Sequence, residues 1–296
     1  MNAVFLSIIG AFSYGLGNIL GRRAVIQVTD ATLGALVILP LSLPFFIIIL
    51  IFTGQLGSVL SFSWQSYFWL SAAGIVAIAS GGPLFLKSMQ LIGANVTAVL
   101  TRVNPLVSVV LGIAVLGEAV TWEILLGVVL IVFGIILIGV NPQIFRRRKN
   151  MFLGIPNRAF LYGIGAGLAW GIGPILVKMG LSDSGSPIAG VFISYLAATI
   201  MWSLTLLSSK RRVALASMKV AAVMFFTLQG LFNYTAQLMM YLALYVAPVI
   251  LVAPLFALQP VFILVLSFLF NRKLEMFGKN VIIGVVAAVV GTILLV

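Results

Sequence analysis

Residues 13–22 read SYGLGNILGR, and residues 169–178 read AWGIGPILVK. An aromatic residue, two glycines, an Ile-Leu pair and a terminal cation recur in the same order, 156 positions apart. Further matches at offsets of 155 to 157 continue along both halves, and Pro105 with Pro260 is one of them. Such an ordered series indicates an internal repeat, so the chain consists of two related halves.

The composition indicates a membrane protein. Of 296 residues, 62% are hydrophobic and 7% are charged, with a formal net charge of +12 and no His or Cys. In soluble domains roughly a quarter of the residues are charged, and disordered chains have few hydrophobic residues, so both classes are excluded. Without imidazole or thiol groups, and with only 5 acidic residues, we expect no catalytic residue, no metal site and no cofactor. The chain is therefore not expected to be an enzyme.

Long apolar stretches predict an all-α polytopic membrane protein. A helix of about 20 residues crosses the ~30 Å hydrocarbon core, whereas a β-barrel would show alternating strands of ~10 residues. About ten transmembrane helices are expected, near residues 3–21, 32–53, 65–86, 93–116, 120–141, 159–181, 187–208, 217–244, 247–270 and 278–296.

The repeat divides these spans into two sets of five. We expect a first repeat at 1–141, a basic linker loop at 142–157 and a second repeat at 158–296. Because five is odd, the second repeat enters the membrane from the opposite side. Inverted-topology repeats of this kind are typical of secondary transporters, whose substrate site lies near the membrane midplane between the repeats.

The distribution of positive charge predicts the orientation. All but Arg102 and Lys178 of the 17 Lys and Arg residues lie in the loops that follow odd-numbered spans. The positive-inside rule places these loops in the cytoplasm. The basic net charge then reflects orientation in a prokaryotic plasma membrane, and no nucleic-acid partner is needed to explain it.

Several local motifs resemble the drug/metabolite transporter superfamily, in particular its ten-helix EamA branch. The resemblance covers nearly the whole chain and implies a transport role without identifying the substrate. Members of this branch usually have cytoplasmic termini, opposite to the orientation that the charges predict here. The motifs are Tyr14-Gly15 with Trp170-Gly171, Asn104-Pro105 with Gln259-Pro260, Leu116-Gly117-Glu118, and the spacing of Gly127 and Gly134.

Arg102 is the one cation expected inside a span. An Arg at the bilayer centre costs at least ~2.5 kcal/mol on insertion scales, and no acidic residue is expected within any span. One interpretation places Arg102 in the cavity, where its guanidinium binds a substrate carboxylate or phosphate. The other has it snorkel, or bind backbone carbonyls freed by Pro105.

Polar and proline residues within spans give further candidates for the cavity. Amides at Asn18, Asn104 and Gln259 need partners in a bilayer, either on neighbouring helices or on the substrate. Prolines interrupt the helical hydrogen bonds, and broken helices are tolerated where they line a cavity, although a packing kink is the alternative. The predicted helix breaks are Pro105, Pro174, Pro254 and Pro260.

Aromatic side chains complete the predicted site. A cavity wall made of aromatic side chains suits apolar metabolites and organic cations, but most aromatic residues in membrane proteins pack or face lipid. The candidates are Tyr14, Trp170, Tyr234, Tyr241 and Phe256. Acidic residues at span ends, including Glu118, are interpreted as partners of helix dipoles.

These features together predict a secondary transporter, an exporter or exchanger of a small metabolite by alternating access. Arg102 favours amino acids or related carboxylate-bearing solutes, and the alternative is an organic-cation or drug exporter with an aromatic-lined cavity. The expected partners are the small-molecule substrate and the lipid bilayer. The chain is a monomer or a homodimer, because its glycine faces suit packing within one chain or between two.

Overall fold

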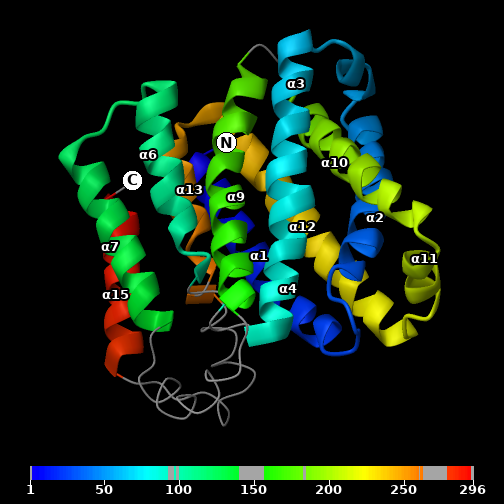
Figure 1. The fold of residues 1–296 in the computed structure, drawn as a ribbon. Coiled ribbons are helices and arrows are strands. Elements are labelled where there is room, and N and C mark those ends of the chain that lie inside the picture. The colour runs from blue at the N-terminus through cyan, green and yellow to red at the C-terminus, as the bar shows by residue number, and fades with distance from the viewer. Residues whose placement is uncertain are drawn as a thin grey trace.

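The computed structural model describes residues 2–92, 97, 100–139, 157–182, 185–259, 261–262 and 279–294. The first half contains α1 (Ala3–Val25), α2 (Leu33–Phe52), η1 (Leu56–Leu60), α3 (Trp64–Ala73), the π-helical segment η2 (Gly74–Gly81), α4 (Gly82–Ile92), α6 (Val103–Leu116) and α7 (Trp122–Gly139). The second half contains α9 (Asn157–Leu181), α10 (Pro187–Ser203), η4 (Leu204–Leu207), α11 (Ser209–Ala216), α12 (Val220–Val246), α13 (Val249–Phe256) and α15 (Lys279–Leu294). Figure 1 shows their arrangement.

The predicted all-α polytopic fold is confirmed, since all regular structure among the described residues is helical. Five helical segments there are long and apolar enough to cross a membrane, and α11 with α12, bent by 97°, would add a sixth. Each of the ten predicted spans contains a described helix, although α6 begins only at Val103. The boundaries of the repeats stay a prediction, and the basic residues of the linker lie outside the described residues.

Helix ends follow from local sequence. The hydroxyl of Ser63 accepts a 3.1 Å hydrogen bond from the Ser66 amide at the start of α3. The hydroxyl of Ser186 does the same for α10, whose first residue is a proline that needs no amide there. Gly117 ends α6 with a φ of 64°, a conformation that glycine adopts without steric cost. These caps fix where the membrane helices begin and end.

The two halves exchange equivalent contacts. In the first half α1 packs on α12, the third span of the second half. Its counterpart α9 packs on α3, η2 and α4, which together form the third span of the first half. Likewise α1 contacts α13, and α9 contacts α6. Such reciprocal contacts are what a two-fold relation between the halves produces.

Helix directions show that the halves are inverted. Residue pairs in contact run in the same order along α1 and α13, and along α9 and α6. They run in opposite orders along α6 and α13, so α1 and α9 point in opposite directions. The pairs are Gly10–Phe256 and Asn18–Gln259 for α1 with α13, Gly163–Leu100 and Gly171–Val107 for α9 with α6, and Gly112–Ile250 and Arg102–Ala257 for α6 with α13.

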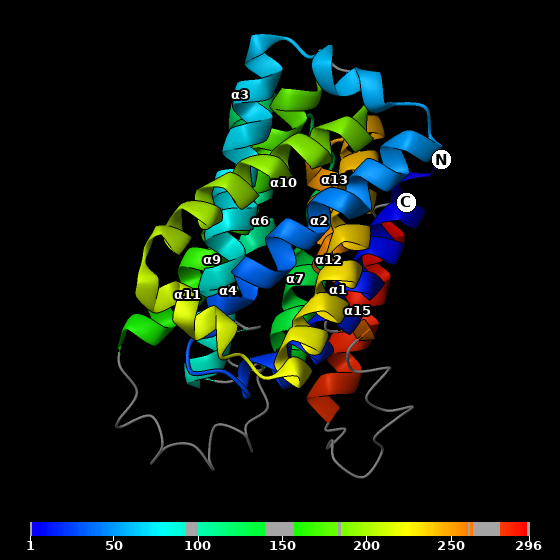
Figure 2. The same ribbon diagram turned by 90° about the vertical axis from the view of Figure 1, so that its right-hand side faces the viewer.

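The fifth spans, α7 and α15, lie side by side at one edge of the molecule (Figures 1 and 2). A Cβ atom on Gly134 would overlap the carbonyl oxygen of Gly284, and one on Gly291 would lie 2.6 Å from the carbonyl oxygen of Gly127. These two contacts are equivalent under the repeat. The glycine faces therefore meet within one chain, where they let two backbones approach closely.

We expect Gly134→Ala to destabilise the protein, because the added methyl group meets the backbone of α15 and neither helix can move away cheaply. Overpacking of this kind costs about 1–3 kcal/mol. Thermal unfolding in detergent measures it. Gly165→Ala in α9 is the matched control, since its Cβ would contact only Leu84, at 3.5 Å. Equal melting temperatures for the two variants would contradict the close approach.

Candidate functional site

A cavity of about 120 Å³ lies between the two halves. Its lining comes from α1, α2, η2, α4 and α6 on one half and from α9, α10, α12 and α13 on the other. No Asp, Glu, Lys or Arg among the described residues lines it. Its polar and aromatic side chains are Tyr14, Asn18, Phe85, Asn104, Ser108, Trp170, Tyr195, Gln229, Asn233, Gln237, Phe256 and Gln259.

Seven residues singled out from the sequence line this cavity: Tyr14, Asn18, Asn104, Trp170, Pro174, Phe256 and Gln259. The amide nitrogen of Asn18 donates a 3.1 Å hydrogen bond to the side-chain oxygen of Gln259, which joins α1 to the residues after α13. Tyr14 and Phe256 meet edge to face, with ring centroids 6.2 Å apart. Their role in substrate binding stays a prediction.

Trp170 is held by the π-helical segment η2. Its indole nitrogen donates to the carbonyl of Ala77 at 3.1 Å, and the indole of Trp202 donates to the carbonyl of Ala79 at 2.6 Å. Gly81 makes room for the first ring, because a Cβ there would lie 2.7 Å from the indole nitrogen. The wider turns of a π-helix, which are frequent at functional sites, thus orient Trp170 along the cavity wall.

Arg102 is not among the residues that line this cavity, and its predicted binding of substrate stays a prediction. Its side chain is 8% exposed, and its guanidinium Nη1 donates a 3.1 Å hydrogen bond to the carbonyl of Ala257. Ala257 directly follows the last residue of α13, Phe256, and the negative end of the helix dipole there suits a cation. The contact agrees with the alternative interpretation, in which Arg102 binds backbone, although the carbonyl belongs to α13.

Tyr234 and Tyr241 are likewise not among the lining residues, and their predicted role in substrate binding stays a prediction. The hydroxyl of Tyr234 donates to the carbonyl of Ile38, and that of Tyr241 donates to the hydroxyl of Ser194 at 2.7 Å. Both side chains are at most 1% exposed. A buried phenol needs a hydrogen-bond partner, and these two find theirs on α2 and α10. They therefore fasten α12 to those helices.

The predicted helix breaks have different outcomes. Pro105 lies in the first turn of α6, where the missing amide is tolerated, and Pro254 lies two residues before the end of α13. Pro174 does not end its helix, since α9 continues to Leu181. It removes a single hydrogen bond, to the carbonyl of Trp170, and the remaining ladder holds the helix. Pro260 lies outside the described residues.

A row of carboxamides on α12 was missed in the sequence. Gln229, Asn233 and Gln237 follow one another at intervals of four and so share one face of the helix. The side-chain oxygen of each is buried without a hydrogen-bond partner, and so is that of Asn104 across the cavity. The spacing was visible in the sequence, but only the structure shows that the oxygen atoms of these amides lack partners.

Charged side chains stabilise the junction where α12 ends and α13 begins. The carboxylate of Glu118 accepts hydrogen bonds from the amides of Val249, at 2.7 Å, and Ile250, at 2.9 Å. The ammonium of Lys178 donates to the carbonyls of Leu244, at 2.7 Å, and Ala247, at 2.9 Å. Each charge is opposite in sign to the dipole end that it meets, so both contacts are favourable. Glu118 is thus a helix-dipole partner, though of α13 rather than of a helix adjacent in sequence.

Inverted five-span repeats around a central cavity, lined by amides and aromatic rings, define a polytopic all-α membrane protein of the transporter type. The sequence model of the EamA-like transporter family matches residues 1–140 and 157–296. The chain therefore belongs to this family, within the drug/metabolite transporters. No curated protein matches the chain.

A solved structure titled only "Crystal structure of protein" is similar to this chain in fold. The two share 14% sequence identity with a TM-score of 0.69, over 99% of this chain and 95% of the other.

We expect Arg102→Ala to lower the melting temperature, because it leaves the buried Ala257 carbonyl without its charged donor. Hydrogen bonds to charged groups contribute about 1.5–3 kcal/mol. The exposed Arg212 offers a control whose replacement by Ala changes stability by less than about 0.5 kcal/mol. Thermal unfolding with and without small amino acids is the measurement. An unchanged melting temperature combined with loss of ligand-induced stabilisation would place Arg102 in the binding site after all.

Proposed function

We propose that this membrane transporter moves amino acids or related small carboxylate-bearing solutes, as an exporter or exchanger, by alternating access. The observation that carries the proposal is the neutral cavity lined by carboxamides. We further propose that the chain catalyses no chemical reaction, works in a prokaryotic plasma membrane with its basic odd-numbered loops in the cytoplasm, and takes a small molecule as its partner.

The chemistry of the lining suits a zwitterion. A carboxamide carries two N–H donors and an oxygen acceptor, so a cluster of them can bind both a carboxylate and an ammonium group. The unpartnered oxygens of Asn104, Gln229 and Gln237 supply the acceptors. A net-neutral solute needs no counter-charge in the cavity, and none lines it among the described residues. An isolated ion would pay for its desolvation there.

The size of the cavity points the same way. At about 120 Å³ it is smaller than the roughly 300–1,000 Å³ of sites for drug-sized ligands. Such a volume suits a solute of a few heavy atoms in this conformation. The rings of Tyr14, Trp170 and Phe256 provide an apolar wall for its side chain.

The aromatic wall also supports the second candidate, an organic-cation or drug exporter. Trp and Tyr faces attract cations by about 0.5–2 kcal/mol, more when the contact is desolvated. The lining carries no carboxylate among the described residues, which weighs against a cation as the principal substrate.

Asn233→Leu and Gln237→Leu should each weaken amino-acid binding about fivefold, since each removes hydrogen bonds that contribute about 1 kcal/mol. Thr235→Val is the matched control on the same helix, because its hydroxyl bonds only to the carbonyl of Leu231 and does not line the cavity. Uptake of radiolabelled amino acids into proteoliposomes, together with ligand-induced melting shifts, measures both.

Three outcomes separate the candidates. Amino-acid uptake that weakens in the two leucine variants and not in Thr235→Val supports the proposal. Uptake of quaternary amines that both leucine variants retain would favour the organic-cation candidate. Equal losses in all three variants would remove the carboxamide row from substrate binding.

A further inference from the structure

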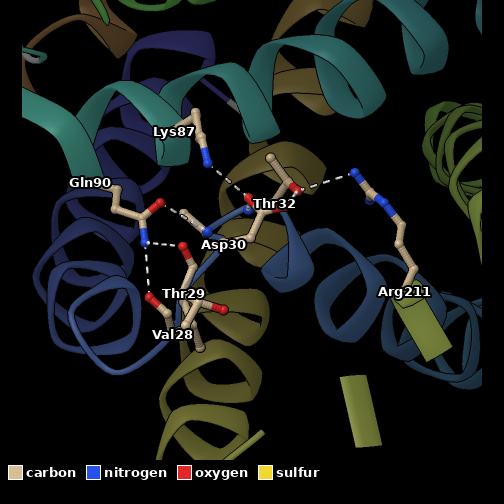
Figure 3. Close-up of polar contacts among 8 residues, drawn as sticks. Val28, Thr29, Asp30, Thr32, Lys87, Gln90 and Arg211 are labelled. Carbon is tan, nitrogen blue, oxygen red and sulfur yellow. Dashed lines mark hydrogen bonds and ion pairs between the residues drawn. The ribbon is translucent and has the colours of Figure 1, made fainter. Parts of the chain in front are cut away.

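The loop between α1 and α2 is fastened to α4 by an ion pair. The ammonium of Lys87 lies 3.1 Å from a carboxylate oxygen of Asp30. The same carboxylate accepts hydrogen bonds from the Thr32 amide, at 3.1 Å, and from the Thr32 hydroxyl, at 2.8 Å. In Figure 3, Lys87 and Gln90 both reach from α4 toward this loop.

Gln90 adds three bonds to the backbone of the same loop. Its side-chain oxygen accepts from the amide of Ala31 at 3.2 Å, and its nitrogen donates to the carbonyls of Val28, at 2.9 Å, and Thr29, at 3.3 Å. Arg211 of α11 approaches from the opposite side and donates to the Thr32 hydroxyl at 3.5 Å. We call Asp30, Thr32, Lys87, Gln90 and Arg211 the polar clasp.

The polar clasp lies directly beyond one end of the cavity. Leu86, which lines the cavity, is the neighbour of Lys87, and Ala35, another lining residue, follows Thr32 by one helical turn. Gln90 likewise lies one turn, about 6 Å, beyond Leu86. The clasp therefore joins elements that border this end of the cavity.

The fastening is polar and accessible to water. The side chains of Lys87 and Asp30 are 29% and 39% exposed, and ion pairs this exposed contribute about 0–1 kcal/mol. Partial burial acts to raise the pKa of Asp30, but the hydrogen bonds from Thr32 and the contact with Lys87 lower it overall. A depressed carboxyl pKa stabilises the clasp above the ordinary Asp pKa, and this is lost only as the pH falls through the lowered value. The ion pair is therefore present at neutral pH and weak enough to break.

We propose that the polar clasp is the gate at the basic end of the cavity, closed in this structure and open in the opposite state of the transport cycle. The inference rests on the proposed transport function. Opening the clasp separates its charged and amide groups from one another and exposes them to water. Ions and amides find new partners in water, so the gate can cycle at low cost, unlike an apolar seam.

A labelling experiment tests the gate without requiring transport. The natural chain has no cysteine, so Ser108→Cys places a single thiol in the cavity lining. In this background Lys87→Glu sets two carboxylates against each other, and Asp30→Lys with Lys87→Glu restores the pair with its charges exchanged. A membrane-impermeant thiol reagent applied at the basic end should label Ser108→Cys with Lys87→Glu several-fold faster than Ser108→Cys alone. The double reversal should return to the parental rate.

Cross-linking tests the same gate by function. Asp30→Cys with Lys87→Cys, joined by a short bifunctional thiosulfonate, should lose uptake and regain it when reductant cleaves the link. Lys210→Cys with Val213→Cys, two exposed positions on α11, is the matched control and should keep its uptake after the same treatment.

The two proposals fail differently. If the unmodified proteins take up no solute, the transport proposal fails, while the labelling rates still decide the gate. If uptake is normal but unchanged by the Asp30–Lys87 cross-link, or if Lys87→Glu labels no faster than its parent, the polar clasp is not a gate.

Discussion

The constraint on which this structure depends is that backbone N–H and C=O groups in hydrocarbon must find partners inside the protein. Several helices here end or widen in the interior of the molecule, and these irregularities free backbone groups. Scarce polar side chains satisfy them. Arg102 serves the end of α13, Trp170 and Trp202 serve the π-helical η2, and Tyr234 serves α2 at Ile38. The charged residues Glu118 and Lys178 serve the two helix ends at the α12–α13 junction.

This use of polar groups separates structural residues from candidate binding residues. A buried polar side chain with a backbone partner has its role explained by the fold. A buried side chain whose oxygen has no partner costs about 1–3 kcal/mol and needs another reason to be retained. The row Gln229, Asn233 and Gln237, with Asn104 opposite, belongs to the second group. Gly17 and Gly21 on α1 leave room for this row, since a Cβ on either would crowd Asn233 or Gln229.

The sequence predicted the fold well because its evidence is local and repeated. Apolar stretches locate the spans, and motif matches reveal the two halves without knowledge of any contact. Seven of the candidate site residues lie together for the same reason, since equivalent positions of an inverted repeat face the shared interface. The contact of Arg102 could not be predicted, because its partner is a main-chain carbonyl 155 positions away, at a helix end that the sequence does not mark. Tyr234 and Tyr241 show the same difficulty, because periodicity cannot distinguish a cavity wall from a helix interface.

The two ends of the cavity are held together by different physics, and this difference suits a protein that must open at one end at a time. At the α12–α13 junction, Glu118 and Lys178 bind main-chain groups of two consecutive helices, so their charges preserve a bend in one continuous segment. Breaking those bonds would leave helix ends unsatisfied. The Asp30–Lys87 pair joins side chains of separate elements, and the main-chain groups that Gln90 binds lie in a loop at the end of α1, where water can replace it. The first arrangement suits a fixed pivot and the second suits a contact that opens and closes.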